Sequence, residues 1–265
     1  MQVCIATAVF MGLSIAIVAF NEEANIGRTL DSVRWADEIV VVDSGSTDRT
    51  KAIAQQCGAK VIVEPWRGHV AQKNYALELC TQDWVLALDA DEEVSLGLAK
   101  EIREVLGSPR SLNGYWIPRK NLFLGKWIRH GGFYPDPKVR LFRRGDGFST
   151  GHDPHDRYEL KSGKAEGRMT NAMIHYAYPN LTYYLEHMNS YSLLGATLAV
   201  AQGHTQFSLA DIVFRPMLTF FYNYFIRLGF LDGREGLLLH LYHSVYVSWK
   251  YSKAWELAQK RSQSA

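Results

Sequence analysis

Residues 84–91 read Trp84-Val85-Leu86-Ala87-Leu88-Asp89-Ala90-Asp91, an apolar run that ends in two aspartates. Buried parallel strands have apolar runs of this kind, and open α/β sheets bind ligands beyond the carboxyl ends of their strands. Two carboxylates one residue apart repel each other unless a cation lies between them. A divalent cation that also binds substrate phosphates is the usual partner. Taken alone, this stretch fits a solvated acidic loop at least as well as a cation site, so the choice depends on the rest of the sequence.

Roughly the first hundred residues alternate between the patterns of strands and helices. The segments with strand character are Leu13–Phe20, Glu38–Val42, Lys60–Val63 and Trp84–Leu88. Between them, apolar residues recur at helical spacing, and the second helix is predicted to begin near Ser46 or Thr47. Strands that alternate with helices of about ten residues form parallel sheets through right-handed crossovers. The predicted fold class is therefore α/β, with a mostly parallel central sheet flanked by helices and a C-terminal helical appendage.

The composition is that of a globular protein. The chain has 265 residues, of which 47% are apolar and 21% are charged, so it can bury a sizeable core and is not expected to be disordered. Its three cysteines are widely spaced and form no C-x-x-C pair, which indicates buried thiols in a reducing compartment. Residues 1–20 contain no charge, but they lack a basic n-region and lead into the first strand. We therefore predict neither a signal peptide nor a membrane span there, and we expect residues 1–12 to be an N-terminal extension.

The second half of the chain has a different character. Aromatic, glycine and basic residues alternate from Tyr115 to His155, which suggests short mixed strands that form one wall of a site. Helices are predicted over 179–265, and two uncharged aromatic stretches there, 216–226 and 236–249, are too short to span a bilayer. From Phe214 to Arg261 there are seven Lys or Arg against three Asp or Glu. Basic, aromatic helices match a dock on an anionic membrane surface; the alternative is a hydrophobic helical hairpin packed on the sheet.

A second strand end carries an acidic residue and a tight turn. Three valines precede Asp43, and Gly45 allows the backbone to turn sharply and approach a ligand. Asp43 is well placed to accept hydrogen bonds from a base or a ribose. A plain strand-to-helix turn accounts for Ser46, Thr47 and Asp48. It does not account for Asp43, which is costly to bury without a partner.

Four stretches, in this order and spacing, closely resemble family 2 of the inverting glycosyltransferases: Ile15–Glu23, Val42–Asp48, Lys73-Asn74 and Leu88–Asp91. Three later stretches are similar to the lipopolysaccharide-core glucosyltransferase branch of that family, namely Val139–Arg144, Ile174–Tyr176 and Gly229–Gly233. The resemblance covers the chain from about Leu13 to Leu257. It implies the nucleotide-diphospho-sugar (GT-A) fold for residues 13–178, with a nucleotide-sugar half at 13–107 and an acceptor half at 108–178. The helical region 179–265 would then dock on the membrane.

The resemblance also implies roles for individual residues. The predicted contacts to the nucleotide-sugar are Ala19, Asn21, Glu22, Asp43, Lys73, Asn74, Asp89 and Ala90. Arg140 is added because apolar residues flank it; it is a candidate for holding the diphosphate or an acidic acceptor, whereas Arg143 and Arg144 fit an exposed turn equally well. The predicted ligands of a divalent cation, Mg²⁺ or Mn²⁺, are Asp91, Asp89 and His175. A sugar–diphosphate leaves as a dianionic group, and a metal ion together with cationic side chains neutralises the charge that develops. For His175, a purely structural role is the alternative.

An inverting transfer also needs a general base that takes a proton from the acceptor hydroxyl. The stretch Gly151–Asp156 lies where the related enzymes carry a His-Glu or similar pair, and His155-Asp156 matches that pair with Asp in place of Glu. The resemblance therefore predicts Asp156 as the base, with Asp153 as the second candidate and Glu159 as the third. A solvated loop of mixed charge is the alternative.

The resemblance and the residues together predict a metal-dependent inverting glycosyltransferase that moves glucose from UDP-glucose to a lipopolysaccharide inner-core sugar, a heptose. The expected partners are a UDP-sugar donor, a lipid-anchored saccharide acceptor and an anionic membrane surface, with no nucleic acid, at the cytoplasmic face of the inner membrane. The alternatives are transfer to a polyprenyl phosphate or another envelope glycan, and a non-catalytic nucleotide-sugar-binding membrane scaffold. A dinucleotide oxidoreductase is poorly supported, because Phe20-Asn21-Glu22-Glu23 stands where G-x-G-x-x-G would follow the first strand.

Overall fold

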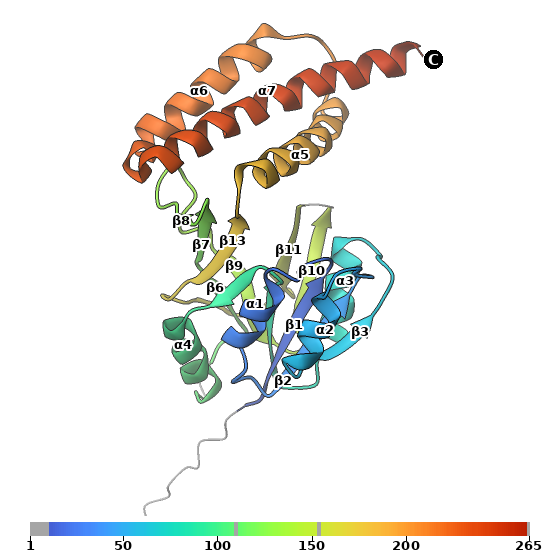
Figure 1. Ribbon diagram of the computed structural model, residues 1–265, viewed down its shortest axis with the longest axis vertical. Helices are drawn as coiled ribbons and strands as arrows, with labels where there is room; N and C mark the ends of the chain where they lie inside the picture. Colours follow the sequence, from blue (N-terminus) through green and yellow to red (C-terminus); the bar gives the residue numbers. More distant parts are fainter. Residues whose placement is uncertain (1–10, 109–110, 153–154, 264–265) are drawn as a thin grey trace, which may run out of the picture. The chain divides into compact units, whose positions relative to one another are not determined.

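The computed structural model describes residues 11–108, 111–152 and 155–263 (Figure 1). The chain forms two compact units. Unit 1 contains the described residues up to Arg119 together with Pro137–His175. Unit 2 contains Lys120–Asp136 together with the described residues from Tyr176 onward.

A seven-stranded sheet forms the centre of unit 1. Its strands are β1 (Leu13–Ala19), β2 (Glu38–Asp43), β3 (Lys60–Val63), β4 (Trp84–Asp89), β6 (Gly114–Ile117), β9 (Lys138–Arg143) and β12 (Glu166–Arg168). Their order across the sheet is β12-β6-β9-β4-β1-β2-β3. The pairs β1–β2, β1–β4, β2–β3 and β6–β12 are parallel, and β9 runs antiparallel to β4 and β6. The predicted α/β class with a mostly parallel central sheet is confirmed.

Both faces of this sheet are buried, which explains why its central strands are continuous apolar runs. Four helices pack on it: α1 (Ile26–Ser32), α2 (Thr50–Gln56), α3 (His69–Glu78) and α4 (Leu96–Leu106). Along β1, Ile15 and Ile17 share a core with α1, α2 and α4. Ala16 points the other way and shares a second core with α3 and with the hairpin of β10 (Gly147–His152) and β11 (His155–Leu160). Successive side chains of a strand point to opposite faces, so neither face has room for a polar alternation.

The turn between β2 and α2 is longer than predicted. α2 begins at Thr50 rather than near Ser46 or Thr47, because the loop after β1 engages the residues before it. Ser46 Oγ accepts a hydrogen bond from the Asn21 amide (2.9 Å), and Asn21 Oδ1 accepts one from the Thr47 amide (2.9 Å). Asp48 Oδ1 accepts a hydrogen bond from the Thr50 amide (3.0 Å), whereas the N-cap residue Arg49 makes no side-chain capping bond.

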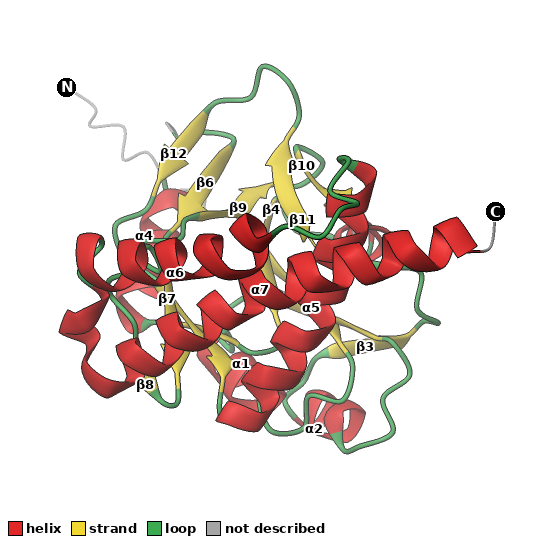
Figure 2. Ribbon diagram, turned by 90° about the horizontal axis from the view of Figure 1, so that it is seen from above, coloured by secondary structure: helices red, strands yellow, loops and turns green. Residues whose placement is uncertain are grey.

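Unit 2 consists of packed helices and one hairpin. α5 (Leu181–Ala201) packs along α7 (Gly233–Gln263), and helical turns from Ala210 to Ile226, with α6 (Arg215–Phe221) at their centre, also contact α7 (Figure 2). The hairpin is formed by β7 (Arg119–Phe123) and β8 (Lys126–Trp127). Within the described part of the chain, no helix combines the length and the apolar character needed to cross a bilayer.

The hairpin belongs to the helical core of unit 2. Phe123 and Ile128 are both 1% exposed and pack with Tyr184 of α5 and Leu239 of α7. The segment 120–136, which the sequence analysis assigned to the acceptor half of the catalytic region, therefore packs with the C-terminal helices.

Candidate active site

Three strand ends meet at one edge of the unit 1 sheet. β1 lies between β2 and β4, with Ala19 opposite Asp43 and Asp89 paired with the residue before Ala19. The register therefore brings the two predicted acidic residues to either side of the end of β1. Thr29 Oγ1 donates a hydrogen bond to the carbonyl of Ala90 (2.7 Å), which holds the turn after β4 in place. Ligand sites of open α/β sheets lie beyond such strand ends.

Asp43 is fully buried, and only one of its carboxylate oxygens has a partner. Oδ1 accepts hydrogen bonds from the amides of Gly45 (3.1 Å) and Ser46 (2.9 Å), whereas Oδ2 has none. The backbone turn after β2 accounts for the hydrogen bonds to Oδ1. An unsatisfied buried acceptor costs about 1–3 kcal/mol or more, so the N–H or O–H of a ligand is a natural complement for the second.

Asn21 and Glu22 fasten the loop after β1 to the loop after β2. Asn21 has a left-handed backbone conformation (φ 54°), which aims its side chain at the second loop. The Glu22 amide donates a hydrogen bond to Thr50 Oγ1 (2.7 Å), and Glu22 Oε2 accepts one from Asn25 Nδ2 (2.8 Å). Burial raises the pKa of the Glu22 carboxyl against the effect of Asn25, and the charge of Asp91 adds to the rise. These predicted nucleotide contacts therefore tie the loop after β1 to the loop after β2, and Glu22 lies near enough to Asp91 for their charges to repel.

A network of buried charges surrounds Asp89. Lys73 Nζ lies 2.9 Å from Asp89 Oδ1 and 2.8 Å from Asp156 Oδ2. Arg140 Nη2 contacts Asp89 Oδ2 and lies 2.8 Å from Glu92 Oε1. Glu92 Oε2 accepts a hydrogen bond from the Asp89 amide (2.9 Å). The network thus joins α3, β4, β9 and β11, and it gathers four predicted site residues.

Electrostatic attraction keeps this network ionised. Burial disfavours the charged form of Asp89, but Arg140 and then Lys73 outweigh it and hold the pKa of the Asp89 carboxyl well below its usual range. Burial also disfavours charge on Lys73, and attraction to Asp89 outweighs it and raises the pKa of the ammonium group. Both cations lie over the ring of Tyr158, at 5.5 and 5.4 Å from its centroid. Burial raises the pKa of the Tyr158 phenol to about 12.

Asp91 and His175 form a separate pair. β5 (Glu92–Val94) pairs antiparallel with β13 (Met173–Tyr178), so His175 stands opposite Glu92 and next to the end of the aspartate turn. His175 Nε2 lies 3.3 Å from Asp91 Oδ2. Burial opposes the charge on Asp91, but the contact with His175 outweighs it and lowers the pKa of the Asp91 carboxyl.

The structure brings together part of the predicted metal site. Asp91 and His175 are adjacent, whereas both carboxylate oxygens of Asp89 are engaged by Lys73 and Arg140. Over the described ranges, no group of three or more His, Cys, Asp or Glu side chains is arranged to hold a metal ion. One carboxylate and one imidazole nonetheless fit a divalent cation that takes its other ligands from substrate phosphates and water.

Of the predicted bases, Asp156 joins the charge network. Its carboxylate is 8% exposed and is oriented by Lys73. Glu159 points to the opposite face of β11, is 41% exposed and forms a surface ion pair with Arg157 (2.6 Å), which removes it as a candidate. Asp153 lies outside the described residues.

Asn74 joins α3 to β10. Its Nδ2 donates a hydrogen bond to the Ser149 carbonyl (2.9 Å), and its Oδ1 accepts one from the Ser149 amide (2.7 Å). Both polar groups of the amide are thus engaged by the protein.

Glu92, Arg119 and Tyr158 were not predicted as site residues. Glu92 is completely buried and lies between Arg140 and Arg119, whose Nη1 is 3.3 Å from Glu92 Oε1. Alternation along β5, with Glu92 and Val94 buried and Glu93 between them, was the available signal. A three-residue alternation is too short to predict a strand from the sequence alone.

The chain is similar in sequence to known glycosyltransferases. The sequence profile of glycosyl transferase family 2 matches residues 14–163. The lipopolysaccharide core biosynthesis glycosyltransferase LpsC of Rhizobium meliloti (strain 1021) is 31% identical over 227 residues, which cover 83% of this chain and 82% of LpsC. A glycosyltransferase of Rickettsia felis is 53% identical over 97 residues, and this match spans 36% of the chain and 34% of the relative.

Two solved structures also resemble the chain. Staphylococcus aureus TarS 1–349, in complex with UDP-GlcNAc, is 15% identical, with a TM-score of 0.48 over 96% of this chain and 92% of TarS. Glucosyl-3-phosphoglycerate synthase from Mycobacterium tuberculosis, in complex with Mn²⁺, UDP and glucosyl-3-phosphoglycerate, is 26% identical, with a TM-score of 0.35 over 43% of this chain and 44% of the synthase.

Proposed function

This chain belongs to glycosyl transferase family 2 and is a GT-A glycosyltransferase, and from that membership we propose that it transfers glucose, with inversion, from UDP-glucose to a heptose of the lipopolysaccharide inner core. One observation carries the proposal. The half-satisfied Asp43, the Asp91–His175 pair and the Lys73–Asp156 pair all belong to the same compact unit, at and around the strand ends of one sheet.

The donor half of the proposal assigns a task to each group. Asp43 Oδ2 accepts a hydrogen bond from the uracil or the ribose, the contact that its burial leaves open. Asp91 and His175 would hold a divalent cation, Mg²⁺ or Mn²⁺, which neutralises charge on the diphosphate. Lys73 and Arg140 add positive charge beside Asp89 and favour departure of the anionic group.

The acceptor half requires one proton transfer. An acceptor hydroxyl attacks the anomeric carbon from the side opposite the diphosphate, and its proton passes to Asp156. The new carbon–oxygen bond forms as the bond to the diphosphate oxygen breaks, so the product has inverted configuration. Lys73 orients the Asp156 carboxylate for this step through its 2.8 Å contact with Oδ2.

The acceptor class is supported by sequence similarity over most of the chain. LpsC carries the name of a lipopolysaccharide core biosynthesis glycosyltransferase and matches 83% of this sequence. The three later stretches similar to the core glucosyltransferase branch point the same way. An acceptor of this kind is anchored in lipid, and we propose that the enzyme works at the cytoplasmic face of the inner membrane.

A donor panel tests the nucleotide site. The thermal midpoint is measured with UDP, GDP, CMP, dTDP and NAD, each with and without Mn²⁺, for the wild type and for Asp91→Ala. A ligand present at ~100 times its Kd adds about 2.7 kcal/mol of stability, which raises the midpoint by several degrees. We expect such a shift with UDP and Mn²⁺ together, and its loss in Asp91→Ala.

The control is Glu104→Ala, which changes an exposed carboxylate on α4 and should keep the UDP shift. Equal shifts with all five nucleotides, or none, would contradict a UDP-sugar site.

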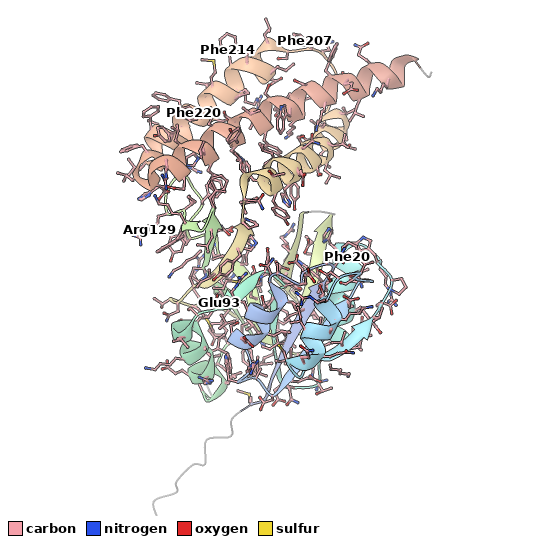
Figure 3. All side chains as sticks on the ribbon, in the orientation of Figure 1. Phe20, Glu93, Arg129, Phe207, Phe214 and Phe220 are labelled. Carbon is pink, nitrogen blue, oxygen red and sulfur yellow. The ribbon has the colours of Figure 1, made fainter. Side chains whose placement is uncertain are left out.

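The membrane part of the proposal rests on one face of unit 2. Eight large apolar side chains from Val213 to Ile226 are between 42% and 68% exposed: Val213, Phe214, Met217, Leu218, Phe221, Tyr222, Phe225 and Ile226. Their spacing puts them on one side of the α6 helical stretch, and Figure 3 shows Phe214 on the side that faces away from α7. No charged residue lies between Arg215 and Arg227, which stand at the two ends.

Apolar faces bordered by arginine suit the interface of an anionic bilayer. The second aromatic stretch is more buried: Leu239 of α7 is 1% exposed and packs in the core, although Leu237 and Leu241 are 40% and 43% exposed. We therefore propose that the exposed α6 face, and not α7, enters the membrane surface.

Vesicle co-sedimentation tests this face. Leu218→Ser combined with Phe221→Ser should lower the binding to phosphatidylglycerol-containing vesicles by about tenfold or more, because each buried apolar side chain contributes roughly 1.5–3 kcal/mol. The matched control is Leu96→Ser, at a residue of unit 1 that is 92% exposed. Unchanged binding by the double variant would refute the assignment, as would loss of self-association without loss of vesicle binding.

A further inference from the structure

The β10–β11 hairpin, which carries Asp156, stands apart from the central sheet of unit 1. Over the described residues its two strands pair with each other and form a sheet of their own. A two-stranded hairpin is marginally stable by itself, so its position depends on what packs against it. α3 and β9 both contact the hairpin, and Figure 1 shows α3 beside it. The position of Asp156 is therefore set by contacts from outside the hairpin.

One side chain of α3, Asn74, is bonded twice to the backbone of β10. Its Nδ2 donates a hydrogen bond to the Ser149 carbonyl (2.9 Å), and its Oδ1 accepts one from the Ser149 amide (2.7 Å). A neighbouring strand would satisfy a residue in the same way, with one donated and one accepted bond. Ser149 is 2% exposed, so water has little access to these bonds. Asn74 therefore holds the strand itself rather than one of its side chains.

The register of the hairpin connects this contact to the proposed base. Ser149 stands opposite Tyr158, which lies two positions after Asp156 on β11. The side chains of Asp156 and Tyr158 therefore lie on the same face of the hairpin. Lys73, which precedes Asn74 on α3, ends 2.8 Å from Asp156 Oδ2. Two adjacent residues of one helix thus hold the hairpin, one at the backbone of β10 and the other at the carboxylate of β11.

The preceding residue of α3, Gln72, is fastened to the turn beside Asp43. Gln72 is completely buried, and its Nε2 donates hydrogen bonds to Ser44 Oγ (3.2 Å) and to the Glu64 carbonyl (3.1 Å). Ser44 follows Asp43 directly in the chain. Residues 72–74 therefore connect, within one turn of helix, the turn that is proposed to bind the nucleotide to the hairpin that carries the proposed base.

We infer that Asn74 is a positioning residue, which fixes the distance between Asp156 and the donor by holding the β10–β11 hairpin on α3. This inference rests on the proposed function, and it replaces the nucleotide contact that the resemblance implies for Asn74 with a role that acts through Asp156. A general base must lie within hydrogen-bond distance of the proton that it takes. A misplacement of about 1 Å can slow a reaction by about 100-fold.

A double-mutant cycle separates this role from a general loss of structure. UDP release is measured with UDP-glucose, Mn²⁺ and a heptose-containing lipopolysaccharide core, for wild type, Asn74→Ala, Asp156→Asn and the double variant. We expect Asn74→Ala to lower kcat by about 10- to 100-fold in the wild-type background. In the Asp156→Asn background it should hardly change kcat, because the group that Asn74 positions is already lost. A merely structural role would lower kcat by the same factor in both backgrounds.

Two further measurements on Asn74→Ala do not depend on transfer. The Kd for UDP with Mn²⁺ should equal that of the wild type, whereas loss of a nucleotide contact would raise it. Amide hydrogen exchange should become faster in β10 and β11 and stay unchanged in β1 and β2, because segments that lose local contacts open more readily. A raised Kd for UDP, or unchanged exchange in the hairpin, would overturn the inference.

The matched control is Asn113→Ala. Asn113 Nδ2 donates a hydrogen bond to Asp146 Oδ2 (2.8 Å), and its Oδ1 accepts one from the Ala165 amide (3.2 Å), so this variant also removes one donated and one accepted bond. Asp146 precedes β10 at the end of the hairpin away from Asp156, and it keeps its 2.9 Å contact with Lys164. The kcat of the control should therefore stay close to the wild-type value.

Equal fold losses in the two backgrounds, or the same loss in Asn113→Ala, would overturn Asn74 as a positioning residue. Normal turnover by Asp156→Asn would instead contradict the proposed base, and a wild type without turnover would contradict the proposed substrates. In both of these cases the hydrogen-exchange result still decides whether Asn74 holds the hairpin.

Discussion

Replacing Asp156 with asparagine should lower kcat by about 10²–10⁴-fold, the usual contribution of a general base. Asparagine has nearly the same shape as aspartate but cannot take the proton of the acceptor hydroxyl. The affinity for UDP should stay unchanged, because Lys73 keeps its 2.9 Å contact with Asp89 and the donor side of the site remains intact. Steady-state transfer kinetics, together with a direct UDP titration, separate the two quantities.

Glu159→Gln is the control for this experiment. Glu159 lies three positions further along β11, its side chain is 41% exposed and it pairs with Arg157, so kcat should be close to the wild-type value. Normal turnover by Asp156→Asn would show that another group is the base. Activity that survives in Asp153→Asn/Asp156→Asn would favour the alternative acceptor, a polyprenyl phosphate, because an ionised phosphate needs no base.

Replacing Glu92 with alanine should lower the free energy of unfolding by about 3–5 kcal/mol, the usual effect of removing one partner from a buried ion pair. Glu92 is completely buried and contacts Arg140 and Arg119, and it accepts the amide hydrogen of Asp89. Its loss would leave two guanidinium groups short of a counter-charge and one amide unsatisfied. Urea unfolding of wild type and variant measures the difference.

The matched control is Glu104→Ala, which removes a carboxylate from an exposed pair with Lys100 on α4. Exposed pairs contribute little, so the free energy of unfolding should hardly change. Glu92→Gln retains the shape and the acceptor oxygen, and its loss of stability should fall between the two. Equal stability of Glu92→Ala and wild type would mean that the network does not support the fold.

Local patterns were sufficient for β1 to β4, but they missed the short strand β5 (Glu92–Val94). The alternation of strand and helix patterns predicted the bounds of β1 to β4 to within one residue. This was possible because a strand that is buried on both faces is apolar at successive positions. The start of α2 was wrong by several residues, since Asn21 from another loop engages Ser46 and Thr47. A pattern confined to one segment cannot show a partner that arrives from elsewhere.

The amino-acid order was also enough to identify the family and the acidic residues at two strand ends, because these depend on residues that are neighbours in the chain. Only the folded chain decided their partners. His175 reaches Asp91 through the pairing of β13 with β5, and Lys73 meets Asp156 because α3 and β11 cover the same face of the sheet. The exposure of the α6 face and the burial of Leu239 in the similar stretch of α7 were likewise decided by packing. The reason is that contacts between distant segments are selected by the whole core, whereas periodicity records only which side of its own element a residue occupies.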